Sequence, residues 1–359
     1  HGPLQGFIPD LVPEDQRGRA SAVKAVMELI PIILVGFTIA QLIGQGQLML
    51  AIIVTAITVF VTMLLTLVTV KEKPLAEKPT ISMKIPMLRV LGMLAGIGLG
   101  ALAGLIGGGA VGGLAGLIAW PFAGKAAALA VAVGLGGVVA MVVAVVSGVW
   151  SGALATLGQD ARRQSSFTWW VVNRLLFLAA ATSFQGFLPF FLMFAFDVSA
   201  EQAASINGTM MMIIGVFVML AAFAGGWLSD RFGKRRVVAV SGLVAAVGAA
   251  MILGAIWVPN MAIIYAAGSV IGMGVGAFMT ANWALGTDLA PAEEAGRYLG
   301  ISNLAGAGAG MIGKGIGGPI ADYLNTYLPG LGYFGIFAAY AILFALSAVS
   351  LRWVRKTRA

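Results

Sequence analysis

The chain has 359 residues, of which 60% are hydrophobic and only 10% are charged, and its formal net charge is +8. Soluble globular proteins have about 25% charged residues, so this composition excludes a soluble domain, and its hydrophobicity excludes a disordered one. There is no cysteine, and the single histidine is at position 1, which argues against disulfides, thiolate metal sites and histidine-based catalysis. We therefore expect an integral membrane protein that is not an enzyme and binds no metal or cofactor.

Ten apolar segments are long enough to cross a hydrocarbon core of about 30 Å as helices, which takes about 20 residues each. They lack the period-two alternation of membrane strands, so we predict an all-α polytopic helical bundle. The ten expected helices are 25–44, 48–70, 90–108, 126–149, 168–194, 204–228, 237–257, 261–287, 298–320 and 332–353. A straight helix over 90–120 would exceed the bilayer thickness, so we expect a span followed by a Gly-rich turn there.

Basic residues are distributed asymmetrically between the predicted loops. Nineteen of the 22 lysines and arginines fall on one side, in alternate loops, whereas Lys125 falls on the other. Positive charge concentrates in cytoplasmic loops, so this pattern predicts a multi-pass protein of the cytoplasmic membrane with both ends of the chain in the cytoplasm. The net charge is therefore a topology signal and argues against nucleic-acid binding.

A ten-residue pattern, D-L-x-P-x-[DE]-x-x-G-R, occurs twice and indicates an internal repeat. Its defining residues are Asp10, Pro13, Gly18 and Arg19 in the first copy and Asp288, Pro291, Gly296 and Arg297 in the second. Two predicted helices follow each copy. Four predicted helices, beginning near Phe167, lead up to the second copy, whereas none precedes the first. We therefore expect two six-helix halves, with about four helices of the first half absent from this sequence; a ten-helix protein is the alternative.

The repeat divides the chain into parts. They are 1–70, the last two helices of the N-terminal half; 71–89, a cytoplasmic loop; 90–149, an inserted Gly-rich helix pair; 150–166, a cytoplasmic linker; 167–354, the C-terminal six-helix half; and 355–359, a cytoplasmic tail.

A charged motif follows the second predicted helix of the C-terminal half. It reads Gly226-Trp227-Leu228-Ser229-Asp230-Arg231-Phe232-Gly233-Lys234-Arg235-Arg236. In wording and position it resembles the G-x-L-x-D-R-x-G-R-R signature of the major facilitator superfamily of secondary transporters, whose plan is two six-helix halves. The resemblance implies a conformational gate in which Asp230 contacts Arg19, or the start of the helix near Ser21, and holds the cytoplasmic side shut. A solvated positive loop is the alternative.

Ionisable residues at membrane depth are costly and mark functional candidates. Arg174 is suited to an anionic or hydroxylated substrate or to a carboxylate partner, and Lys314 lies deeper in its predicted helix. Glu28 can carry a coupling proton or pair with Lys24 one turn earlier. Three amides in predicted spans are expected to be buried and to bind a sugar-like or drug-like solute, or else to join helices: Gln185, Asn207 and Asn282.

These observations favour a secondary active transporter that moves a small solute by alternating access, coupled to a proton or another cation. The Asn173-Arg174 pair after two tryptophans, together with the D-L-x-P loops, resembles the glycoside and sucrose symporter branch of the superfamily. That resemblance implies a sugar-like substrate. The alternative is a non-transporting membrane assembly or scaffold protein, because a fold alone does not define a function.

Overall fold

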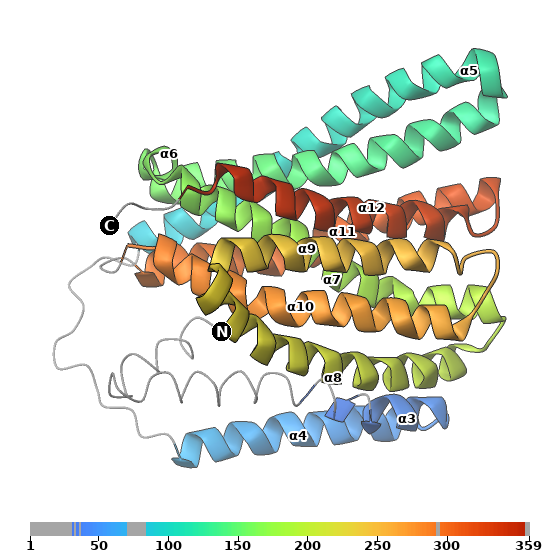
Figure 1. Ribbon diagram of the computed structural model, residues 1–359, viewed down its shortest axis with the longest axis horizontal. Coiled ribbons are helices and arrows are strands. Elements are labelled where there is room, and N and C mark those ends of the chain that lie inside the picture. The colour runs from blue at the N-terminus through green and yellow to red at the C-terminus, as the bar shows by residue number, and fades with distance from the viewer. Residues whose placement is uncertain (1–30, 32–33, 36, 70–83, 292–294, 356–359) are drawn as a thin grey trace.

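The computed structural model describes residues 31, 34–35, 37–69, 84–291 and 295–355 as helices joined by short turns, without a β-strand in these ranges (Figure 1). The helices are α3 (Ile39–Gly44), α4 (Leu48–Thr69), α5 (Lys84–Leu157), α6 (Asp160–Arg163), α7 (Ser165–Phe196), α8 (Ala200–Phe232), α9 (Lys234–Leu253), α10 (Met261–Leu289), α11 (Ala295–Tyr327), α12 (Leu331–Ser350) and the 3-10 helix η3 (Leu351–Trp353).

Several of these helices are long and apolar enough to cross a membrane, which confirms the predicted all-α polytopic class. The described residues contain seven such stretches: Leu48–Thr69, Met87–Leu157, Ser165–Phe196, Ala200–Phe232, Lys234–Leu253, Met261–Leu289 and Leu331–Trp353. The helices of the C-terminal half extend beyond most of the predicted limits. Ser199 forms a capping box with Gln202 at the start of α8, and Asn260 caps α10.

The Gly-rich turn predicted after residue 108 is wrong. The helix continues through Gly107–Gly109 and Gly112–Gly113, and the chain reverses only at Gly124, whose φ is +77°. In a membrane, backbone N–H and C=O groups must pair within the segment, which favours an unbroken helix even through glycines. The two arms of α5 therefore form a long hairpin that leans away from the other helices (Figure 1).

Small residues hold the two arms of this hairpin together. A Cβ atom on Gly96 would lie 2.6 Å from the backbone nitrogen of Gly152, so the backbones are in direct contact. Two serine hydroxyls of the second arm donate to carbonyls of the first: Ser151 Oγ to the Gly96 oxygen at 2.7 Å, and Ser147 Oγ to that of Gly100 at 3.3 Å. Close approach through small residues and hydroxyl groups is the usual way that helices associate in lipid.

Two adjacent glycines test this packing. A Cβ on Gly108 would meet the backbone of the facing arm, whereas a Cβ on Gly109 would meet nothing within 4 Å. We expect Gly108→Val to separate the arms and destabilise the protein by about 2 kcal/mol, lowering the melting temperature by roughly 4–8 °C. Gly109→Val is the control and should melt like the wild type. Tryptophan fluorescence during heating measures both, and equal melting temperatures would contradict the observed hairpin.

The remaining helices pack around α7 and α10. α10 lies against α8 and α9, α12 lies against α9 and α7, and α11 packs on α7, α12 and the α5 hairpin. α3 packs on α8, and α4 lies beside α3. The α8–α9 turn, α6 and η3 lie at one end of the bundle, on the left in Figure 1, and we call this the basic end. The α5 turn, followed by Lys125, lies at the opposite end.

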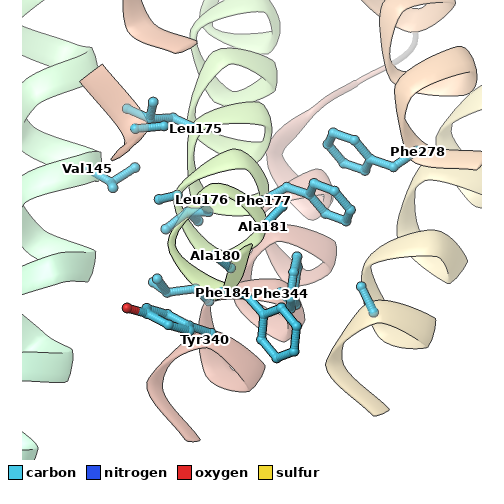
Figure 2. Close-up of a cluster of buried hydrophobic side chains, with 14 of the residues drawn as sticks. Val145, Leu175, Leu176, Phe177, Ala180, Ala181, Phe184, Phe278, Tyr340 and Phe344 are labelled. Carbon is cyan, nitrogen blue, oxygen red and sulfur yellow. The ribbon is translucent and has the colours of Figure 1, made fainter. Parts of the chain in front are cut away.

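Aromatic side chains fill the core on one side of α7 (Figure 2). The ring of Phe177 stacks on Phe278 of α10, with centroids 3.6 Å apart, and meets Phe344 of α12 edge-on at 4.9 Å. Two turns further along, Phe184 packs on Phe337 at 5.3 Å. These contacts fix one face of α7 against α10 and α12.

Candidate functional site

The polar candidates on α7 lie beside the aromatic face. Arg174 and Gln185 are eleven residues apart, which is three turns of an α-helix, so both lie on one face. Leu178 and Thr182 lie between them on the same face and are half-buried. The prediction that Gln185 is buried is wrong: its side chain is exposed, because the aromatic core occupies an adjacent face of the helix.

Arg174 belongs to a buried polar network that joins α7, α10 and α12. Its Nη1 donates to Oδ1 of Asn282 at 3.1 Å, and Nδ2 of Asn282 donates to Oδ1 of Asn173 at 2.8 Å. Nδ2 of Asn173 then donates to the carbonyl of Ser347 at 2.7 Å, and Nε1 of Trp170 donates to the carbonyl of Asn282 at 3.0 Å. The prediction that Asn282 is buried is confirmed, since no part of it is exposed.

The guanidinium of Arg174 has no counter-ion in this network. It lies 5.2 Å from the ring centre of Trp283 and 6.0 Å from that of Trp170, and the side chain is 8% exposed. Its Nε is buried without a hydrogen-bond partner. No carboxylate of the described residues lies within ion-pair distance. A buried charge without a partner is strongly unfavourable, so this group is suited to bind an anion or several hydroxyl groups.

Lys314 is a second basic group on the same side of α7. Its side chain is exposed and crosses from α11 onto α7 at Gly186, where a Cβ atom would lie 2.5 Å from Cε and 2.9 Å from Nζ. The sequence identified Lys314, but the glycine against which its side chain lies was missed.

Asn207 lies apart from these groups, eight residues into α8. Its side chain is half-buried, and its Oδ1 is buried without a hydrogen-bond partner. Nearby in the sequence, Ser205 Oγ donates to Oε1 of Gln41 at 3.0 Å, and Nε2 of Gln41 donates to Oγ1 of Thr209 at 3.1 Å. This polar bridge between α3 and α8 was not predicted, although Gln41, a polar residue within the apolar segment 25–44, could have indicated it.

The charged motif forms the turn between α8 and α9 at the basic end. Gly233 adopts φ +90°, a conformation that favours glycine. The guanidinium carbon of Arg231 lies 5.4 Å from the ring centre of Trp227. Lys234 Nζ contacts Asp288 at 2.6 Å, so the motif meets the second copy of the repeat. A cleft of about 1010 Å³ opens here, and its charged lining residues are Asp230, Lys234, Arg235, Arg236, Asp288 and Arg352.

The remaining predicted site residues lie near the ends of α8, α10 and α11 or outside the described part of the chain. Gly226 lies in the last turns of α8, and Asp230 is exposed. Pro291 follows α10, whereas Gly296 and Arg297 lie in the first turn of α11, where only the backbone is described. Five residues lie outside the described part of the chain: Asp10, Pro13, Gly18, Arg19 and Glu28. The expected contact of Asp230 with residues 19–21 therefore stays a prediction.

Comparison with known proteins agrees with this architecture. Residues 89–314, more than half of the chain, match the Major Facilitator Superfamily, and the chain belongs to that family. It is 30% identical over 93 residues to the minor myo-inositol transporter IolF of Bacillus subtilis. That match covers 26% of this chain and 20% of the relative, so the chain spans about a fifth of that protein's length.

Proposed function

We propose that the protein is a secondary active transporter that moves a small solute by alternating access, with its basic end facing the cytoplasm. Family membership supports this function, and the observation that carries it is the buried, unpaired guanidinium of Arg174 beside Asn282 and Trp283. Intramembrane charges without a structural partner mark the paths of substrates and ions. Arg174 lies nine residues into α7, about 14 Å along the helix from its start near the basic end.

We further propose that the solute is hydroxylated and sugar-like. Amide groups and tryptophan rings together recognise sugars, since the amides bind hydroxyl groups and the rings cover C–H faces. Trp283, beside Arg174, and Gln185, three turns further along α7, provide such groups at two points of the solute path. Asn282 is fully buried and holds Arg174 in place. The relative from B. subtilis is named for myo-inositol, a cyclic polyol, which supports the same class. A proton or another cation is the proposed coupling ion, with Glu28 as its carrier.

Uptake into proteoliposomes tests this function directly. Sugars and polyols are supplied outside vesicles that contain the purified full-length protein, with and without a pH gradient. We expect uptake to exceed that of protein-free vesicles and to increase with the gradient. Uptake that equals the background for every solute would instead favour the alternative, an assembly or scaffold protein on the same fold.

The motif at the basic end is proposed as a gate controlled by Asp230. We expect Asp230→Asn to weaken the closed state of the cytoplasmic side and to lower uptake about tenfold, because one charge-assisted contact contributes about 1.5–3 kcal/mol. This chain has no cysteine, so a cysteine introduced at Thr182 reports accessibility to an impermeant maleimide. Labelling from the basic end should become faster in the variant.

Asp160→Asn is the matched control for this experiment. Asp160 is another acid at the basic end, on α6, and its ion pair with Arg163 is long, at 4.0 Å. Pairs of this kind contribute little, so this variant should keep wild-type labelling and uptake. If Asp230→Asn also leaves both unchanged, Asp230 is a solvated loop residue and not part of a gate.

A further inference from the structure

Lys314 lies close to the middle of its helix. α11 runs from Ala295 to Tyr327, and Lys314 is three residues past its central residue. The nearer end is 13 residues away, about 20 Å along the helix axis. A lysine at this depth is not stable against lipid and normally faces the bundle interior or a water-filled path.

The surroundings of Lys314 hold its ammonium in place without neutralising it. The side chain lies flat on α7 because Gly186 has no Cβ; a methyl group there would lie 2.5 Å from Cε and 2.9 Å from Nζ. We call this gap in the surface of α7 the Gly186 notch. Throughout the described ranges, no acid pairs with this ammonium and no hydrogen-bond acceptor contacts it. The ammonium therefore lies against the Gly186 notch, exposed and without a partner among the described residues.

We propose that Lys314 binds an anionic group of the transported solute, a carboxylate or a phosphate carried on a hydroxylated carbon skeleton. This inference rests on the proposed transport function and narrows its substrate class. Charge-assisted hydrogen bonds from ammonium to carboxylate or phosphate are among the strongest in proteins. Gln185, the next residue along α7 before Gly186, is exposed and binds the hydroxyl groups of the same solute. Solute sites of this class of transporter lie near the bilayer midplane, and Lys314 lies near the middle of α11.

Arg174 is too far away to share this contact. It precedes Gly186 by twelve residues on α7, which corresponds to about 18 Å along the helix. A small solute does not span that distance, so the two basic groups serve different points of one path. Lys314 binds the anionic group at the centre, and Arg174 contacts the solute nearer the basic end.

Solute uptake and binding by the wild type, Lys314→Gln and Lys314→Arg test the proposal. The probes are D-gluconate for a carboxylate, glucose 6-phosphate for a phosphate and myo-inositol for a neutral polyol. We expect one of the two anions to bind and enter best, which identifies the anionic group. Lys314→Gln should lower its affinity about 30-fold, whereas Lys314→Arg keeps affinity within about fivefold. The proposal would be overturned if the neutral polyol entered as fast as the anions and Lys314→Gln left the uptake of all three probes unchanged.

Titration calorimetry separates this proposal from the transport function. Anion binding that is lost in Lys314→Gln, without uptake of any probe, supports the site and refutes transport. Uptake of myo-inositol without anion binding supports transport and refutes the site. Absence of both anion binding and uptake overturns the two together.

Gly186→Ala provides a second test that keeps the charge. The added methyl group displaces the ammonium from α7 and should weaken anion binding about tenfold. Gly315→Ala is the matched control, because Gly315 adjoins Lys314 and a Cβ there meets nothing within 4 Å. Size-exclusion chromatography verifies that both variants are folded. Equal anion affinity in the two variants would refute the role of the Gly186 notch in holding the ammonium.

Discussion

Replacing Asn282 by aspartate is expected to reduce solute uptake at least 100-fold while the protein stays folded. The amide and the carboxylate have the same shape, so the new carboxylate would lie where Oδ1 now accepts from Arg174 at 3.1 Å. It would neutralise the guanidinium and remove the charge that the solute path uses. The aspartate has no N–H group to donate to Asn173, and this loss costs about 1 kcal/mol. The new ion pair between the aspartate and Arg174 offsets that cost, because the guanidinium is already buried.

Arg174→Gln is the companion variant, since it removes the charge and keeps a hydrogen-bonding group. Uptake should fall to a similar level in both variants, because both remove the unpaired charge. Uptake assays combined with melting curves from tryptophan fluorescence distinguish this result from misfolding. Wild-type uptake by Asn282→Asp would show that Arg174 only joins α7 to α10.

The membrane class and the polar candidates were predictable from the sequence because each depends on local patterns. Continuous apolar segments indicate the spans, and charges within them are visible without a structure. The network of Arg174 was only partly predictable. Asn282 was recognised as a polar group in a span, but its contact with Arg174 joins residues 108 positions apart. Such a contact depends on how α7 and α10 cross, which no local pattern encodes.

The failures have the same origin. The Gly-rich part of α5 was expected to turn because a straight helix over 90–120 would exceed the bilayer thickness, whereas in this hairpin the glycines let the two arms touch. Gln185 was expected to be buried because its segment is apolar, but burial depends on which face of α7 meets the aromatic core. The Gly186 notch was missed for the same reason, since its partner, Lys314, comes from α11.

A second large effect is expected from Gly276→Val, which should destabilise the protein by about 3 kcal/mol and lower the melting temperature by roughly 6–12 °C. Gly276 lies where α10 crosses α8, and an added Cβ would overlap the Val218 carbonyl and lie 3.0 Å from the backbone nitrogen of Ala222. Backbone atoms cannot rotate away as a flexible side chain can, so the two helices must separate.

The control for this crossing is Gly113→Val, which makes the same chemical change in another membrane helix. Gly113 is exposed on α5, and a Cβ there meets nothing within 4 Å. It should melt within about 1 °C of the wild type, because surface substitutions away from special features change stability by less than about 0.5 kcal/mol. Melting followed by tryptophan fluorescence measures both variants.

Since α10 also carries Asn282 six residues further on, separation of α10 from α8 should reduce solute uptake together with stability. An unstable Gly276→Val variant with full uptake would show that the network of Arg174 does not depend on this crossing.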